Sequence, residues 1–364
     1  MPENAKKKLP RIVLLASEHT VSEYSMFLDR LLVGLAEEAV PAALVLPSKC
    51  NPGRVFAAHA EVISHPILDL PFMEPLNIRL LVERLRKFEP TVLHCLCETK
   101  ASLTRQLARR LDLPYVLMVN SLHGRWRHVS ISSTHCARIV APAKSIADNL
   151  AETHPRFADR IEQVNIGTFV SGTAVCFSEP SRLACMVVAQ PLGNADGFEK
   201  LFNVIRHLNI DGYEFMMVAV LGGKTDRQVW KLLAALGLLH IVTVVPKSMP
   251  WRAVLSAGDI FVQPQPSRAF DPLLLEAMSI GSAVAGCNGG VSDLIIEDQT
   301  AVVFDPNDEV SIMRTLQRLL DRREFARQIG RNSQQYLREN HKVSRMISTT
   351  LRTYQEAQEW PRHP

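Results

Sequence analysis

Residues 261–308 read FVQPQPSRAFDPLLLEAMSIGSAVAGCNGGVSDLIIEDQTAVVFDPND, and this stretch has the clearest structural pattern in the chain. An apolar strand leads into a loop, a helix that begins at Asp271 and Pro272, a second short strand, and the pair Gly289 and Gly290. Helix amino termini and paired glycines present backbone N–H groups, which favour anions when they face one cleft. The stretch predicts an α/β unit with an anion site at its loops.

Short apolar runs alternate with helix-length segments along the rest of the 364 residues. Runs rich in Val, Ile and Leu that are separated in this way are typical of parallel strands buried on both faces. We expect two doubly wound sheets of about six strands each. The predicted strands are IVLLA (12–16), AALVL (42–46), TVLHCL (91–96), YVLMV (115–119), ARIVA (137–141) and EQVNI (162–166), then ACMVVA (184–189), FMMVAVL (215–221), HIVTVV (240–245), DIFVQ (259–263), SAVAG (282–286) and AVVF (301–304).

Amphipathic spacing places helices between these strands, and the chain becomes mostly helical after Phe304. At roughly 150 residues per domain the length suits two domains. The segment 169–182, which is rich in Gly, Ser, Thr and Pro, is the expected linker between a first domain at 1–168 and a second at 183–342. The predicted helices are 22–38, 76–87, 101–111, 145–152, 199–208, 227–236, 250–257, 272–280, 309–321, 324–340 and 343–358.

Composition and charge restrict the function classes. No stretch approaches the 18 or so apolar residues that would span a bilayer, and we expect a cytoplasmic protein. The first 168 residues contain 21 Lys and Arg against 17 Asp and Glu, so the net charge of +4 belongs to this half. The excess is compatible with peripheral attraction to an anionic membrane surface, but it is too small for a nucleic-acid partner.

The cysteines and one His-Cys-Leu-Cys run raise the question of a metal site. Seven cysteines, most of them in apolar runs, are expected to be reduced thiols. His94, Cys95 and Cys97 lie close together in sequence, but no second pair follows at a zinc-ligand spacing. We therefore expect packing residues here and no metal.

Six motifs, in the expected order, resemble those of family 4-like glycosyltransferases of the GT-B type. The likeness extends over nearly the whole chain and includes a strand-end histidine at His123 and a segment that closes the first domain. The matching stretches are Leu122-His123-Gly124, Val164 to Thr168, Gly222-Gly223, Gly258 to Pro264, Leu273 to Ala285, and Gly289 to Leu294.

This resemblance implies two Rossmann-like domains facing across a cleft, a nucleotide-sugar donor, and an acceptor that the sequence does not identify. It also implies transfer with retention of configuration, no cofactor besides the donor, and a last helix (343–364) that packs back on the first domain. His123 would contact the sugar near the reacting carbon, and Arg268 the diphosphate. The donor-binding residues that it implies are Glu276, Gly289, Gly290, Val291, Gln190, Gly222 and Gly223.

Several residues depart from the family pattern where the chemistry would occur. Arg268 stands eight positions before Glu276, where the family has a second glutamate, and Gln190 and Asp196 replace two cations that hold the donor diphosphate. Asp271-Pro272 would place a carboxylate and a residue without an N–H at the start of the phosphate-binding helix. Two functions stay open: a retaining glycosyltransferase, in which Arg268 supplies the missing charge, or a catalytically inactive homologue that serves as a binding or scaffold protein.

The ordinary structural alternatives for single residues also stay open. Arg268 is either a diphosphate ligand or a solvent-facing loop residue. Glu276 is either a ribose ligand or a buried helix carboxylate, and the position of His123 after a strand favours a ligand contact.

Overall fold

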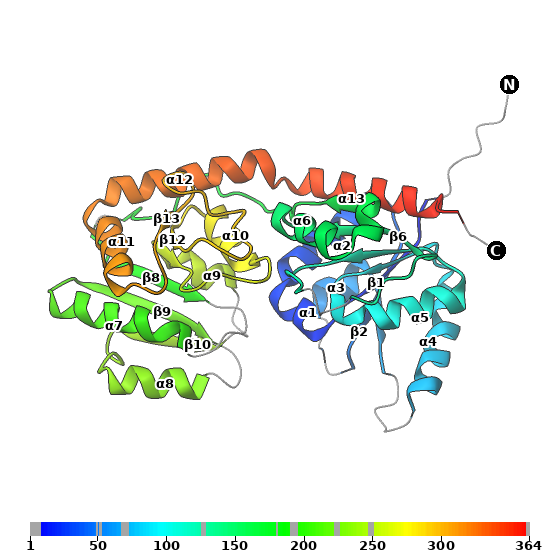
Figure 1. Cartoon of the computed structure of the whole chain (residues 1–364), viewed down its shortest axis with the longest axis horizontal. Helices are drawn as coiled ribbons and strands as arrows, with labels where there is room; N and C mark the ends of the chain where they lie inside the picture. Colours follow the sequence, from blue (N-terminus) through cyan, green and yellow to red (C-terminus); the bar gives the residue numbers. More distant parts are fainter. Residues whose placement is uncertain are drawn as a thin grey trace. The chain divides into compact units, whose positions relative to one another are not determined.

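The computed structural model describes residues 9–48, 50, 53–66, 73–124, 129–179, 181–189, 196–221, 226–246 and 251–361. The chain divides into two compact units. The first contains Met1–Gly167 and Val343–Pro364, and the second contains Thr168–Lys342. Each unit is a parallel sheet with helical crossovers (Figure 1), which confirms the doubly wound α/β fold expected from the alternating apolar runs.

The first unit has a seven-stranded sheet in the order β3-β2-β1-β4-β5-β6-β7. Its strands are short, and the central ones are buried along their whole length, which explains their continuous apolar sequences. The element that the sequence patterns missed is the edge strand β3, with the helix α3 before it. The strands are β1 (Ile12–Leu15), β2 (Ala42–Leu46), β3 (Glu61–Ser64), β4 (Val92–Cys95), β5 (Tyr115–Met118), β6 (Cys136–Ala141) and β7 (Ile161–Gln163).

The helices of the first unit begin and end close to the predicted positions. A difference lies at 22–38, where Ser17 caps a short separate helix before the main one begins at Ser25. The α-helices are α1 (Glu18–Glu23), α2 (Ser25–Glu37), α3 (Gly53–His59), α4 (Glu74–Phe88), α5 (Ala101–Leu111), α6 (Lys144–Thr153) and α13 (Val343–Gln358); the 3₁₀ segments are η1 (Glu98–Lys100) and η2 (Pro155–Arg160).

The second unit repeats this architecture with six strands in the order β10-β9-β8-β11-β12-β13. Its core lies between the sheet and the apolar faces of α7, α8, α11 and α12. The elements are β8 (Ala184–Ala189), α7 (Asp196–Ile210), β9 (Phe215–Leu221), α8 (Asp226–Ala235), β10 (Val242–Pro246), α9 (Trp251–Ser256), β11 (Ile260–Val262), α10 (Pro272–Ser279), β12 (Ala283–Gly286), β13 (Val302–Val303), α11 (Glu309–Asp321) and α12 (Arg323–Asn340).

The last helix, α13, packs against α2 and against strands β4, β5 and β6 of the first unit (Figure 1). Gly34 of α2 allows a close approach, since a Cβ there would meet Ile347 Cδ1 at 2.5 Å. Tyr354 of α13 is fully buried, and its hydroxyl lies 2.7 Å from His94 Nδ1. The C-terminal helix therefore completes the hydrophobic core of the first unit.

Segment 169–182, the expected linker, lies against the second unit. The Ser171 amide donates to Ser279 O, and the Val175 amide donates to Ile280 O. All seven cysteines lie among the described residues, and none of them is in a disulfide. No helix in the described part of the chain has the length and apolar character needed to cross a membrane.

Candidate functional site

Two loops meet at the carboxyl edge of the second sheet. One follows β11 and the other follows β12, and these strands are neighbours in the sheet. The Val291 amide donates to Ser267 O at 2.7 Å, which ties the two loops together. Gly289 and Gly290 have φ values of +105° and +63°, a backbone conformation that favours glycine. This bond uses the Val291 amide to close the turn, and donor binding by Gly289, Gly290 and Val291 stays a prediction.

The helix that follows the first loop, α10, begins with a carboxylate cap. Asp271 Oδ1 accepts hydrogen bonds from the amides of Leu273 (2.9 Å) and Leu274 (3.2 Å), and Asp271 is only 4% exposed. Pro272, the first helical residue, has no amide hydrogen to offer. The predicted N-cap at Asp271 is confirmed, and a negative group already neutralises the positive end of this helix.

Arg268 lies in the same loop, between Ser267 and Ala269, and its residue is exposed. Ser267 Oγ accepts from the Ala269 amide and donates to Ala269 O, so the backbone on both sides of Arg268 is fixed. Arg268 itself makes no hydrogen bond or ion pair with the part of the chain that the structure describes. Its guanidinium is thus available to an anion at this edge of the sheet.

Glu276 lies about one turn after the first residue of α10, Pro272, and is 1% exposed. Its Oε1 accepts a hydrogen bond from Thr168 Oγ1 at 3.0 Å. This contact fits the buried-carboxylate alternative, and the ribose contact stays a prediction. A bond to Thr168 also ties α10 to the first residue of the second unit.

A buried glutamine at the end of β11 was not selected by the sequence analysis. Gln263 is 3% exposed, and its Oε1 has no hydrogen-bond donor among the described residues. A buried acceptor without a donor is costly unless water or a ligand supplies one. The sequence feature that could have indicated Gln263 is a polar residue that ends an apolar strand and precedes Pro264.

The first unit collects polar groups at the carboxyl ends of β4 and β5, which are adjacent strands. Glu98 follows β4, and its Oε1 accepts hydrogen bonds from the amides of Asn120 (2.8 Å) and Ser121 (3.0 Å) and from Ser121 Oγ (2.9 Å). Asn120 Nδ2 in turn donates to Leu96 O at 3.0 Å. One carboxylate therefore holds the two strand-end loops together.

His123 lies beside this carboxylate and is buried. Its Nε2 is 3.4 Å from Glu98 Oε1, and its backbone exchanges two hydrogen bonds with the Asn149 side chain of α6. Burial favours protonation of Glu98, but the interactions with His123, Asn120 and Ser121 outweigh it, so the pKa of Glu98 is lowered. An ionised Glu98 therefore lies beside the imidazole of His123. The family resemblance predicts His123 as a site residue, whereas Glu98 lies in none of the motifs and was not predicted.

Among the described residues, no group of three or more His, Cys, Asp or Glu side chains is placed to hold a metal ion. His94, which the sequence places beside two cysteines, is bonded to Tyr354 through Nδ1. Cys95 donates its thiol hydrogen to Cys97 O. His94, Cys95 and Cys97 are buried packing residues of the first unit.

Residues 179–336, which include both loops and α10, match the family described as glycosyl transferases group 1. This match lies within the second unit, which is therefore similar to group 1 glycosyl transferases. It is 26% identical over 250 residues to the D-inositol 3-phosphate glycosyltransferase of Salinispora tropica, an alignment that covers 60% of this chain. The chain spans about half the length of that relative, since the alignment covers 51% of it.

Solved structures of glycosyltransferases have the same fold. A glycosyltransferase from Rickettsia africae aligns with a TM-score of 0.77 at 14% identity, over 96% of this chain and 99% of its own. Anabaena Alr3699/HepE, solved in complex with UDP and glucose, aligns with a TM-score of 0.76 at 13% identity, over 94% and 99% of the two chains. At these identities the likeness establishes the GT-B fold alone.

Three predicted donor residues, Gln190, Gly222 and Gly223, lie outside the described residues. Asp196 is the first residue of α7, and its side chain is also outside them. Lys200 of α7 donates to Asn307 O at 2.6 Å. Of the predicted site residues that the structure describes, Arg268, Asp271 and the turn at 289–291 lie together at the carboxyl edge of the second sheet.

Proposed function

We propose that this chain transfers a sugar from a nucleotide-sugar donor to an acceptor, with retention of configuration at the transferred carbon. The observation that carries the proposal is the paired loop at the carboxyl edge of the second sheet. Ligands of doubly wound sheets bind outside the carboxyl ends of the strands, where the strand order reverses. In this sheet the reversal lies between β8 and β11, beside the loop that contains Arg268.

Arg268 is proposed to bind the donor diphosphate. It is a permanently charged group with five N–H donors, on a loop whose backbone is fixed. The turn at Gly289 and Gly290 offers close backbone approach, and the solved relative in complex with UDP and glucose supports this ligand class. Glu276 is proposed to accept from the ribose as well as from Thr168, and His123 is proposed to contact the transferred sugar.

The chemistry requires that negative charge on the departing diphosphate be stabilised. The bond between the anomeric carbon and the phosphate oxygen breaks, and the acceptor oxygen bonds to that carbon on the same face. The acceptor proton passes to the departing phosphate oxygen. Because no positioned carboxylate attacks the sugar in this scheme, stabilisation of the leaving phosphate is the main catalytic contribution. Arg268 is the residue proposed to provide it.

Binding is tested by thermal unfolding with UDP, GDP, UDP-glucose and GDP-mannose. A ligand at 100 times its Kd stabilises the folded protein by about 2.7 kcal/mol. We expect one nucleotide to raise Tm and Arg268→Ala to remove most of that increase. The matched control is Arg314→Ala, which removes an exposed arginine of α11. No change in Tm with any of the four ligands at millimolar concentration contradicts the proposal.

Stereochemistry is tested with water as the acceptor. Proton NMR distinguishes the anomers of the sugar released from the donor before they interconvert. Retention predicts that the first signal belongs to the anomer present in the donor. A first signal from the opposite anomer excludes a retaining mechanism, whatever the binding experiment shows.

A second candidate function is a homologue that binds ligands without turnover. One observation favours it: the carboxylate of Asp271 occupies the amino terminus of α10, where a phosphate would otherwise accept the amides of Leu273 and Leu274. Binding of a nucleotide without release of sugar over many hours would favour this alternative. Measurable turnover that Arg268→Ala abolishes would exclude it.

A further inference from the structure

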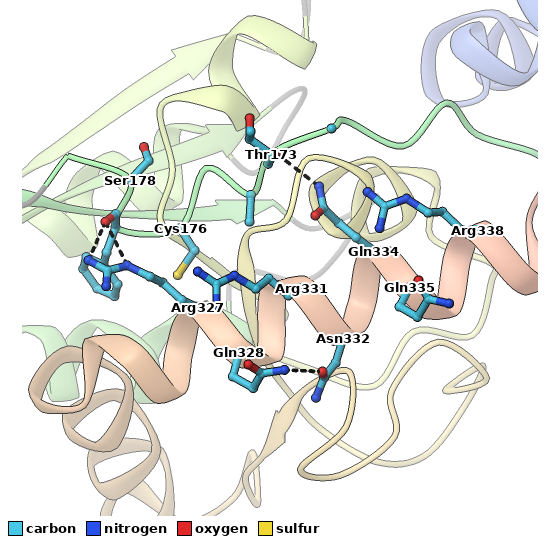
Figure 2. Close-up of a pocket in the computed structure, with 13 residues that line it drawn as sticks. Thr173, Cys176, Ser178, Arg327, Gln328, Arg331, Asn332, Gln334, Gln335 and Arg338 are labelled. Atoms are coloured by element: carbon cyan, nitrogen blue, oxygen red, sulfur yellow. Dashed lines mark hydrogen bonds between the residues drawn. The ribbon is translucent and has the colours of Figure 1, made fainter.

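A polar groove runs along one side of α12 in the second unit. It has a volume of about 730 Å³ and lies between α12 and segment 172–178. Figure 2 shows that Arg327, Arg331 and Arg338 project from α12 on the side of this segment, and Gln328 and Asn332 also line the groove. Positions 327, 331 and 338 share one helix face, because they are separated by four and seven residues. All residues that line the groove belong to one compact unit.

The groove is at the opposite edge of the sheet from the candidate donor site. The Phe177 amide donates to Asp259, which directly precedes β11, and the Cys176 amide donates to Gly281 O, just before β12. Segment 172–178 is therefore at the amino ends of the strands. The loops of Arg268 and Gly290 follow the carboxyl ends of the same strands. A ligand in the groove is thus distinct from the proposed donor.

The side chains in the groove are cationic or neutral, with no carboxylate among the lining residues. Arg327 donates to Phe177 O and to Glu324, and Arg338 donates to Ser171 O at 2.8 Å. These two arginines therefore have part of their donors engaged. Among the described residues, Arg331 has a single contact, at 3.5 Å with Glu324, and its side chain is 56% exposed. Arg331 lines the groove, so most of its donors are available to a ligand there.

We propose that this groove binds an oligoanion that carries two or more phosphate groups, with Arg331 as the principal ligand. The helix rise places Arg331 about 6 Å from Arg327 and about 10 Å from Arg338 along the axis. Phosphates at such separations pair with different guanidinium groups, each through charge-assisted hydrogen bonds. Glu324 pairs with Arg327 and Arg331 at one end, so the net positive charge is greatest between Arg331 and Arg338. Two sources share this chemistry: a free polyphosphorylated metabolite and the headgroups of an anionic lipid surface.

The test uses tripolyphosphate as the probe for a free ligand and phosphatidylglycerol vesicles as the probe for a lipid surface. Titration calorimetry of the full chain with tripolyphosphate is carried out with and without saturating UDP. We expect binding that UDP does not displace, and a Kd that rises by about tenfold or more in Arg331→Gln. Arg314→Gln, an exposed arginine of α11 outside the groove, should bind like the wild type.

Vesicle cosedimentation with the same variants distinguishes the two sources. Binding to phosphatidylglycerol vesicles that Arg331→Gln abolishes, without measurable tripolyphosphate binding, assigns the site to lipid headgroups and supports the proposal. Arg338→Gln is the second variant and should weaken whichever ligand binds. The proposal is overturned if UDP displaces all bound tripolyphosphate, if Arg331→Gln and Arg314→Gln bind equally, or if neither probe binds.

Discussion

Gly290 and Ser267 approach so closely that a Cβ at position 290 would lie well inside the van der Waals contact distance from Ser267 O. The two residues belong to different loops, one after β12 and one after β11. The contact is possible because glycine lacks a side chain and readily adopts the φ of +63° found here. The glycine pair therefore fixes the mutual position of the two loops.

Gly290→Ala tests this relationship. The clash with a carbonyl and the positive φ together should lower the free energy of unfolding by about 1 to 3 kcal/mol. Chemical denaturation measures the change. Gly172→Ala is the matched control, since a Cβ at Gly172 meets no atom within 4 Å. Equal stabilities of the two variants would show that the loops do not depend on Gly290.

Asp271→Asn separates the two roles of the helix cap. Asparagine caps as well as aspartate does, so stability should change little. Loss of the negative charge from the amino terminus of α10 should strengthen UDP binding roughly two- to fivefold. Titration calorimetry measures the affinity, and Asp308→Asn is the control because Asp308 caps a different helix, α11. Unchanged or weaker UDP binding in Asp271→Asn would show that the carboxylate does not compete with phosphate.

Glu98→Gln tests the carboxylate that holds His123. The lowered pKa of Glu98 means that its ionised form stabilises the folded state. This contribution is present above the ordinary pKa of 4.5 and is lost as the pH falls through the lower pKa of the folded state. The stability difference between wild type and Glu98→Gln should therefore shrink in acid. Denaturation curves between pH 3 and pH 7 measure it, and a difference independent of pH contradicts the prediction.

Buried His94 predicts a separate acid sensitivity. Burial lowers the pKa of His94 from 6.5 to about 3, so the folded state holds it neutral while the unfolded state takes up a proton. Stability should fall as the pH decreases from about 6.5 towards 3, by about 1.4 kcal/mol per pH unit from this group. His94→Gln should remove that part of the slope. If the variant and the wild type have equal slopes, His94 does not titrate as stated.

Much of the fold could be predicted from local patterns. The observed bounds of α5, α11 and α13 are those predicted, because apolar spacing and capping residues act within a few turns of one helix. The edge strand β3 was not predicted, because its local pattern differs from that of the other strands. Its sequence, EVIS, is short and has one buried residue, Ile63, at a sheet edge, so it lacks the continuous apolar run that marked the central strands.

Local sequence patterns specify the alternating strands and helices, the cap at Asp271 and the loops that contain Arg268 and Gly290. Folding of the whole chain places Glu98 beside His123 and bonds Thr168 to Glu276, 108 residues away. Each short-range pattern depends on neighbours along the chain. Contacts between strand ends depend on which strands become adjacent through long crossovers, and no local pattern specifies that order.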